Sequence, residues 1–129
     1  MAQYNHLPIF QLTYKLTIAI YQTTHLFPRD FKYTLGQKLK EVISDLLNLI
    51  VEANSMKYKT ETLERAWTKF EQFRIQLRLA CDLKILGLKR YEAFNRDLEE
   101  IAKQLSGWLE WSRKNCQPAS CVIPAKAKV

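Results

Sequence analysis

Apolar residues recur at alternating steps of four and three between positions 35 and 53, and this periodicity constrains the fold more than any other feature of the chain. The residues at these steps are Leu35, Leu39, Val42, Leu46, Leu49 and Ala53. This spacing lays one apolar stripe along an α-helix, as in helices that pack side by side in a left-handed bundle. A second run with steps of three and four consists of Tyr91, Phe94, Leu98, Ile101, Leu105 and Trp108. The two stripes predict an all-α fold of long packed helices.

Breaks in the apolar pattern divide the chain into four expected helices, at about 8–25, 32–56, 60–86 and 90–114. Pro8 suits a first helical turn, Pro28 opens the first connection, and Gly87 suits a left-handed cap after the third helix. Thr60 is placed to cap the start of that third helix. Only three Gly and four Pro occur in 129 residues, which disfavours turn-rich β architecture. We predict one up-down-up-down four-helix bundle over residues 1–114.

The first and third expected helices are apolar on more than one face. Lys15 is the only charged residue between Ile9 and Thr24. The third helix has a second apolar line opposite its core stripe, formed by Ile75, Leu79, Leu83 and Leu86. A peripheral helix of a small monomer cannot bury two faces, so we expect a homo-oligomer.

The net charge of +7 favours an anionic partner without naming one. Four of these charges belong to residues 111–129, which hold four basic residues and no acidic one. From Asn115 the composition turns to Gln, Pro, Ala, Ser and Lys, so we expect residues 115–129 to form a disordered basic tail. Neither a secretion signal nor an apolar span of about 18 residues occurs, which predicts a cytoplasmic protein with no membrane contact.

Residues that carry catalysis or bind metals are scarce and isolated. His6 and His25 have no companion Cys or Ser at a useful spacing, and glycine-rich phosphate loops are absent. Three cysteines, Cys81, Cys116 and Cys121, have no histidine nearby with which to form a zinc site. The sequence therefore predicts no catalytic residue, no metal, no cofactor and no enzymatic activity.

Arg74 and Arg78, one helical turn apart, are the strongest candidates for a binding site. At 100° per residue from Leu63, Arg74 falls within the stripe of Leu63, Trp67, Phe70, Leu77 and Cys81, and Arg78 lies at its edge. A guanidinium stays charged and needs a carboxylate or a phosphate there. Glu71 and Asp82 can reach Arg78, whereas we expect Arg74 to face inward or into an interface. An ion pair within the chain or between subunits and a functional binding surface both remain open.

Six further basic residues complete the candidate binding surface: Arg29, Lys32, Lys38, Lys40, Arg65 and Lys69. The last four have acidic residues within about one turn, so ion pairs on the helix surface are the alternative for them.

Aromatic side chains are a separate candidate for contact with unpaired bases, although most lie on core stripes. Two have basic neighbours and positions that leave them free to stack. Tyr58 stands between Lys57 and Lys59 in a connection, and Trp111 stands near Arg113 and Lys114.

Several segments, in this order and spacing, resemble a family of small four-helix-bundle proteins. They are Phe27-Pro28-Arg29, Tyr33-Thr34-Leu35-Gly36, the run from Leu46 to Asn54, the run from Leu77 to Lys84, and Ser106-Gly107-Trp108-Leu109. The family includes the accessory variability determinant (Avd) of diversity-generating retroelements and the protein encoded by intervening sequences in bacterial 23S ribosomal RNA genes. The resemblance covers about residues 9–112. Val51-Glu52-Ala53-Asn54 and the Arg-x-x-x-Arg spacing on the third helix are more similar to the Avd branch.

The resemblance implies a homopentameric, positively charged ring that binds a reverse transcriptase and its template RNA, or DNA. Mutagenic synthesis of complementary DNA then belongs to the reverse transcriptase, and Arg74 and Arg78 match the basic pair expected to bind. The alternative is a homo-oligomeric scaffold of the intervening-sequence type, which binds protein partners without nucleic acid.

Overall fold

The computed structural model describes residues 4–115, and all the secondary structure within them is helical. The helices are α1 (Pro8–His25), α2 (Arg29–Lys32), α3 (Leu35–Ser55), α4 (Thr60–Asp82) and α5 (Leu88–Asn115). The all-α fold class is therefore confirmed. Tyr33 and Thr34 interrupt the expected second helix, so the structure divides it into α2 and α3. The rest of the expected tail, with Cys116 and Cys121, lies outside the described residues.

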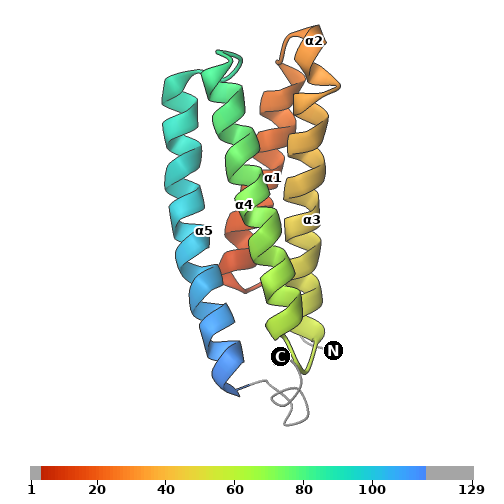
Figure 1. Ribbon diagram of the computed structural model, residues 1–129, viewed down its shortest axis with the longest axis vertical. Coiled ribbons are helices and arrows are strands. Elements are labelled where there is room, and N and C mark those ends of the chain that lie inside the picture. Colours follow the sequence, from red (N-terminus) through yellow and green to blue (C-terminus); the bar gives the residue numbers. More distant parts are fainter. Residues whose placement is uncertain (1–3, 116–129) are drawn as a thin grey trace, which may run out of the picture.

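The four long helices pack side by side and alternate in direction (Figure 1). Their order around the bundle is α1, α3, α4, α5, and α5 returns to contact α1. Consequently α1 and α4 stand at opposite corners. The single turn α2 lies at the end where α1 joins α3, and α5 ends at the other end of the bundle (Figure 1). We call these the α2 end and the α5 terminus.

Apolar stripes of the four long helices meet in one core. All six positions of the predicted stripe on α3 are buried, together with Ile43 and Ile50. On α5 the buried apolar positions are Phe94, Leu98, Ile101, Leu105 and Leu109, while Tyr91 and Trp108 pack against the core at its edge. Removing these faces from water, at roughly 25 cal/mol per Å² of apolar surface, is the main contribution to stability.

The stripe of α4 differs from the expected one. The buried residues on this helix include Leu63, Ala66, Phe70, Phe73, Leu77 and Ala80. Phe73 fills a core position, and the side chain of Arg74 is 51% exposed on the flank towards α5. Of the two alternatives expected for Arg74, an inward-facing position was therefore wrong, and a position at an interface stays a prediction. Counting angles from Leu63 alone rotated the expected stripe away from Phe73.

The end of α4 also differs from the expectation, because the helix stops at Asp82 and not near Leu86. Lys84 adopts the left-handed conformation, with φ of 64°. The backbone N–H of Ile85 donates to the Ala80 carbonyl at 3.0 Å, which is the longer bond of a Schellman motif. The chain then turns inward and buries Leu86, so Leu86 does not belong to the exposed line of α4. Gly87 has no positive φ, and the expected cap at Gly87 was wrong.

Buried threonines are an unusual feature of α1. The hydroxyl of Thr24 donates to the Ile20 carbonyl at 2.8 Å. Thr13 is fully buried, and among the described residues its Oγ1 is the buried side-chain polar atom that has no hydrogen-bond partner. A buried hydroxyl without a partner costs the free energy of removing it from water.

Thr13→Val is expected to raise the free energy of unfolding by about 1 kcal/mol, because valine keeps the shape and removes the unpaired hydroxyl. Thr24→Val is the matched control and is expected to be neutral or to destabilise by up to about 1 kcal/mol, since it removes a bonded hydroxyl. Urea unfolding at one fixed protein concentration measures both. Destabilisation by Thr13→Val would show that its hydroxyl has a partner.

Lys84→Gly is expected to stabilise the protein by roughly 0.5–1 kcal/mol, because glycine adopts the left-handed conformation without a Cβ clash. Gly87→Ala is the control. A Cβ at position 87 meets nothing within 4 Å, so this variant is expected to unfold within about 0.5 kcal/mol of the wild type. A large loss of stability on Gly87→Ala would contradict the observed cap.

Candidate functional site

The structure distributes the eight candidate basic residues over three parts of the bundle. Arg74 and Arg78 lie on the flank of α4 that faces α5. Arg65 and Lys69 lie on the other flank of α4 and contact α3. The remaining four belong to α2 and the first two turns of α3: Arg29, Lys32, Lys38 and Lys40. A single binding surface, as expected from the sequence, would require the eight residues to share one continuous face, and they do not.

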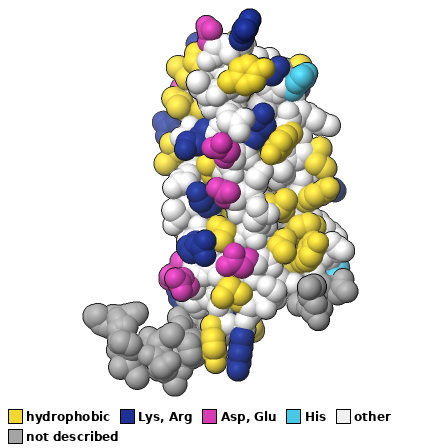
Figure 2. All heavy atoms as spheres, turned by 90° about the vertical axis from the view of Figure 1, so that its right-hand side faces the viewer, with side chains coloured by type: hydrophobic (Ala, Val, Ile, Leu, Met, Phe, Trp, Pro, Cys, Tyr) yellow, Lys and Arg dark blue, Asp and Glu magenta, His cyan; other side chains and the backbone are white. Residues whose placement is uncertain are grey.

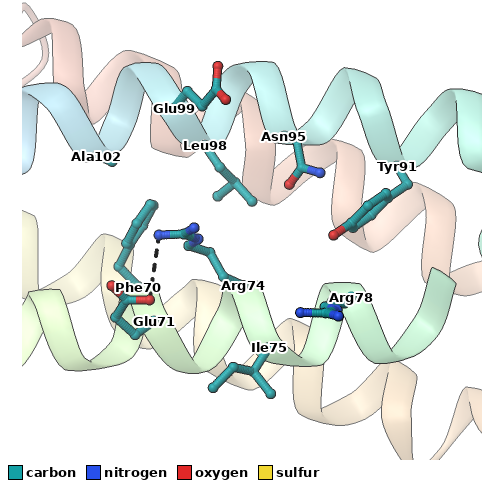
Figure 3. Close-up of a pocket in the computed structure, with 10 residues that line it drawn as sticks. All are labelled: Phe70, Glu71, Arg74, Ile75, Arg78, Tyr91, Asn95, Leu98, Glu99 and Ala102. Atoms are coloured by element: carbon teal, nitrogen blue, oxygen red, sulfur yellow. Dashed lines mark ion pairs between the residues drawn. The ribbon is translucent and has the colours of Figure 1, made fainter. Parts of the chain in front are cut away.

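Arg74 and Arg78 line an open groove between α4 and α5, with a volume of about 380 Å³ (Figure 3). Figure 3 shows Leu98 and Tyr91 projecting from α5 towards α4, and Arg74 extending from α4 towards α5. The complete lining is Phe70, Glu71, Arg74, Ile75, Arg78, Tyr91, Asn95, Leu98, Glu99 and Ala102. The groove thus combines an apolar lining with charged and hydrogen-bonding groups.

Each arginine of the groove forms an ion pair with a carboxylate of its own helix. Arg74 Nη1 lies 3.5 Å from Glu71 Oε1, and the Arg74 guanidinium lies 5.6 Å from the centre of the Phe70 ring. Arg78 Nε lies 3.7 Å from Asp82 Oδ2. Glu71 therefore pairs with Arg74 and not, as expected, with Arg78. All four side chains are more than 40% exposed, so these pairs are weak and leave guanidinium donors free for another anion.

The charges that line the groove balance. Two guanidinium groups stand against the carboxylates of Glu71 and Glu99. The groove therefore attracts a simple polyanion only weakly. Its lining suits a partner that offers apolar surface together with groups of both charge signs.

Arg65 and Lys69 are engaged across the α3–α4 contact. Arg65 Nη1 lies 3.7 Å from Glu52 Oε2, and Lys69 Nζ lies 3.2 Å from Asp45 Oδ2. Surface ion pairs, the alternative considered for Arg65 and Lys69, are therefore present. They join α4 to α3, whereas the expected pairs lay within about one turn of the same helix. These partners were not among the acidic residues considered from the sequence, since they are 13 and 24 positions away along the chain.

The α2 end carries a group of basic residues that sequence reasoning did not unite. They are Arg29 and Lys32 of α2, Lys84 of the α4–α5 connection, and Lys89 and Arg90 in the first turn of α5. Within residues 4–115 none of them forms an ion pair, and Arg90 Nη1 donates to Thr23 Oγ1 at 3.1 Å. Lys84, Lys89 and Arg90 were missed because more than 50 positions separate them from α2.

Two apolar surfaces lie on the outside of the bundle. The α1 face consists of Tyr14, Ile18 and Tyr21, each 44–50% exposed, and the α4 face consists of Ile75, Leu79 and Leu83, each 43–63% exposed. Figure 2 shows a column of hydrophobic side chains running along one side of the molecule. Exposed apolar side chains grouped in this way are candidate surfaces for contact with another molecule.

Metal ligands and membrane-spanning helices bear on function as well. No group of three or more His, Cys, Asp and Glu side chains is placed to hold a metal ion within residues 4–115. None of the described helices is both long enough and apolar enough to cross a membrane.

The chain was compared with models of known protein families and with curated proteins. The family model described as bAvd-like matches residues 7–112, from the residue before α1 to the last turn of α5. Curated proteins gave no match.

Replacing both Arg74 and Arg78 by Ala is expected to lower the free energy of unfolding by less than about 1 kcal/mol, because both ion pairs are exposed and lie within one helix. Phe70→Ala is the contrast, with an expected decrease of about 3–5 kcal/mol on emptying the core. Denaturant unfolding measures both. A decrease above about 2 kcal/mol for the arginine variant would make these residues structural.

Proposed function

The chain belongs to the bAvd-like family, and on that premise we propose that it is a non-catalytic accessory protein of a diversity-generating retroelement. It binds the reverse transcriptase and the template RNA of that element and supports mutagenic cDNA synthesis. The chemistry of synthesis belongs to the reverse transcriptase. The family match over residues 7–112 is the observation that carries this proposal, and the surfaces of the bundle supply its physical support.

Binding to RNA follows from the distribution of positive charge. Contacts to phosphates dominate the affinity, with little reading of bases. Arg29, Lys32, Lys38 and Lys40 form no ion pair among the described residues and are free to meet phosphates. Arg65 and Lys69 must first leave the carboxylates of α3, so each contributes less.

Arg74 and Arg78 can serve either partner, because their carboxylate partners on α4 are easily exchanged for a phosphate or for a carboxylate of the reverse transcriptase. The mixed lining of the groove favours the protein partner, whereas RNA contacts reach the two arginines from the groove opening. In both cases the arginines act as binding residues with no part in chemistry.

Assembly into a ring follows from the two apolar faces. The α1 face and the α4 face differ in composition and stand on helices at opposite corners of the bundle. When one copy covers its α1 face with the α4 face of the next, the contact is head-to-tail, and such contacts close into a ring when the rotation permits. Membership in the family supports five subunits.

RNA binding is tested by titrating a structured RNA across about 50–300 mM salt. The wild type is expected to show a steep fall of log affinity with log salt. The variant with Arg74→Ala and Arg78→Ala is expected to show a slope shallower by roughly one for each phosphate that it no longer neutralises. Replacing Lys15 and Lys103 by Gln is the control with an equal change of charge.

The outcomes separate the two functional readings. An arginine variant that matches the Lys15 and Lys103 control would remove these arginines from the RNA surface. Failure of the wild type to bind any RNA would favour the protein-only scaffold of the intervening-sequence type.

Ile18→Lys or Ile75→Glu is expected to reduce the native mass from that of a ring towards the 15.2 kDa of one chain, because a charge enters one of the two apolar faces. Gln22→Glu, on an exposed position of α1, is the control and is expected to leave the ring intact. Light scattering gives the mass, and circular dichroism shows whether the helices persist. A monomeric wild type would contradict the ring.

A further inference from the structure

The α5 terminus brings together two segments that are about 50 positions apart in the sequence. Thr60, the first residue of α4, and Ser112, in the last turn of α5, are both buried, and their hydroxyl oxygens lie 3.0 Å apart. The expectation that Thr60 caps α4 was wrong, because its hydroxyl makes this contact with Ser112 and no cap hydrogen bond. Arg113 Nη2 lies 3.2 Å from Glu64 Oε2 and adds a second link. The start of α4, directly after the connection that carries Tyr58, is therefore held against the end of α5.

Two aromatic rings are exposed at this end of the bundle. Tyr58 precedes Thr60 by two positions and is 44% exposed, and Trp111 adjoins Ser112 and is 49% exposed. The other two tryptophans, Trp67 and Trp108, are partly buried against the core. Packing of the bundle therefore does not account for Tyr58 and Trp111. Each offers apolar ring surface to an external partner.

Positive charge accompanies the two rings. Lys59 Nζ donates to the carbonyls of Ala53, Asn54 and Met56 and so caps the end of α3. Arg113 is engaged with Glu64. Lys57 and Lys114 form no ion pair among the described residues, and Lys57 Nζ lies 5.4 Å from the centre of the Tyr58 ring. The surface thus offers two rings and two free ammonium groups.

We infer that the α5 terminus binds a single-stranded segment of RNA, with unpaired bases stacked on Tyr58 and Trp111 and phosphates at Lys57 and Lys114. This inference rests on the proposed function and gives it a second RNA site, distant from the α2 end. Aromatic rings beside free lysines are the combination by which proteins hold single strands. Duplex RNA cannot use the rings, because its bases are stacked on one another. A template that is being copied is unpaired, so it has the required form.

The test compares a fluorescently labelled 12-nucleotide oligouridylate with a 12-base-pair RNA duplex in anisotropy titrations at fixed salt. The variant with Tyr58→Ala and Trp111→Ala is expected to bind the single strand roughly tenfold or more weakly than the wild type. Its affinity for the duplex is expected to stay within about twofold. The wild type is the reference, and the double phenylalanine variant, which keeps a ring at both positions, is the matched control.

Two further variants separate stacking from charge. Replacing both Tyr58 and Trp111 by Phe keeps a ring at each position and is expected to retain the affinity for the single strand within about threefold. Replacing Lys57 and Lys114 by Gln is expected to weaken binding and to reduce the salt slope by roughly 1.4, the value for two phosphate contacts on a single strand. The aromatic variants are expected to leave that slope unchanged.

The outcomes distinguish this inference from the proposed function. A Tyr58→Ala and Trp111→Ala variant that keeps its helices and binds oligouridylate like the wild type overturns the inference and leaves RNA binding in place. A wild type that binds neither RNA removes the proposed function itself. Equal weakening of binding to the single strand and to the duplex would also overturn the inference, since stacking requires unpaired bases.

Discussion

Burial of Phe70 and Phe73 on α4 is the constraint on which the arrangement of the binding surfaces depends. Both rings are fully buried and fix the rotation of α4 about its own axis. The same rotation turns Arg74 and Arg78 towards α5, and Arg65 and Lys69 towards α3. The hydrophobic effect, which has no directional preference, thereby decides which charged groups can reach one another and which remain available to a partner.

The resulting bundle separates its surfaces by their chemistry. The α4–α5 groove is mixed and electrically balanced, the α2 end is basic, and the α5 terminus combines rings with lysines. The α1 and α4 faces are apolar and stand at opposite corners. A scaffold that must hold an enzyme, an RNA and further copies of itself needs such distinct surfaces, because one surface cannot serve three partners at once. This division of surfaces supports the proposed accessory role.

The net charge of the chain does not show which basic side chains are paired with carboxylates and which are unpaired. Five of the basic side chains in residues 4–115 are committed to carboxylates, including Arg65, Lys69, Arg74 and Arg78. Exposed pairs of this kind contribute little stability, but they reduce the field that a polyanion experiences. Among the described basic side chains without an ion pair, Arg29, Lys32, Lys84 and Lys89 lie at the α2 end, and Lys57 and Lys114 lie at the α5 terminus. Others, such as Lys15 and Lys103, lie along the sides of the bundle.

The sequence by itself determined the all-α class, the core stripes of α3 and α5, the apolar excess on α1 and α4, and the resemblance that the family match confirmed. These properties are local, because helical periodicity depends on residues that are three and four positions apart in the sequence. Tertiary structure decided the rotation of α4, because this helix is apolar on two faces and contacts with α3 and α5 select the face with Phe70 and Phe73 for the core. It also decided the left-handed turn at Lys84, the Arg65–Glu52 pair and the contact of Thr60 with Ser112. Such contacts join positions whose separation follows from how whole helices pack, and no local pattern encodes that separation.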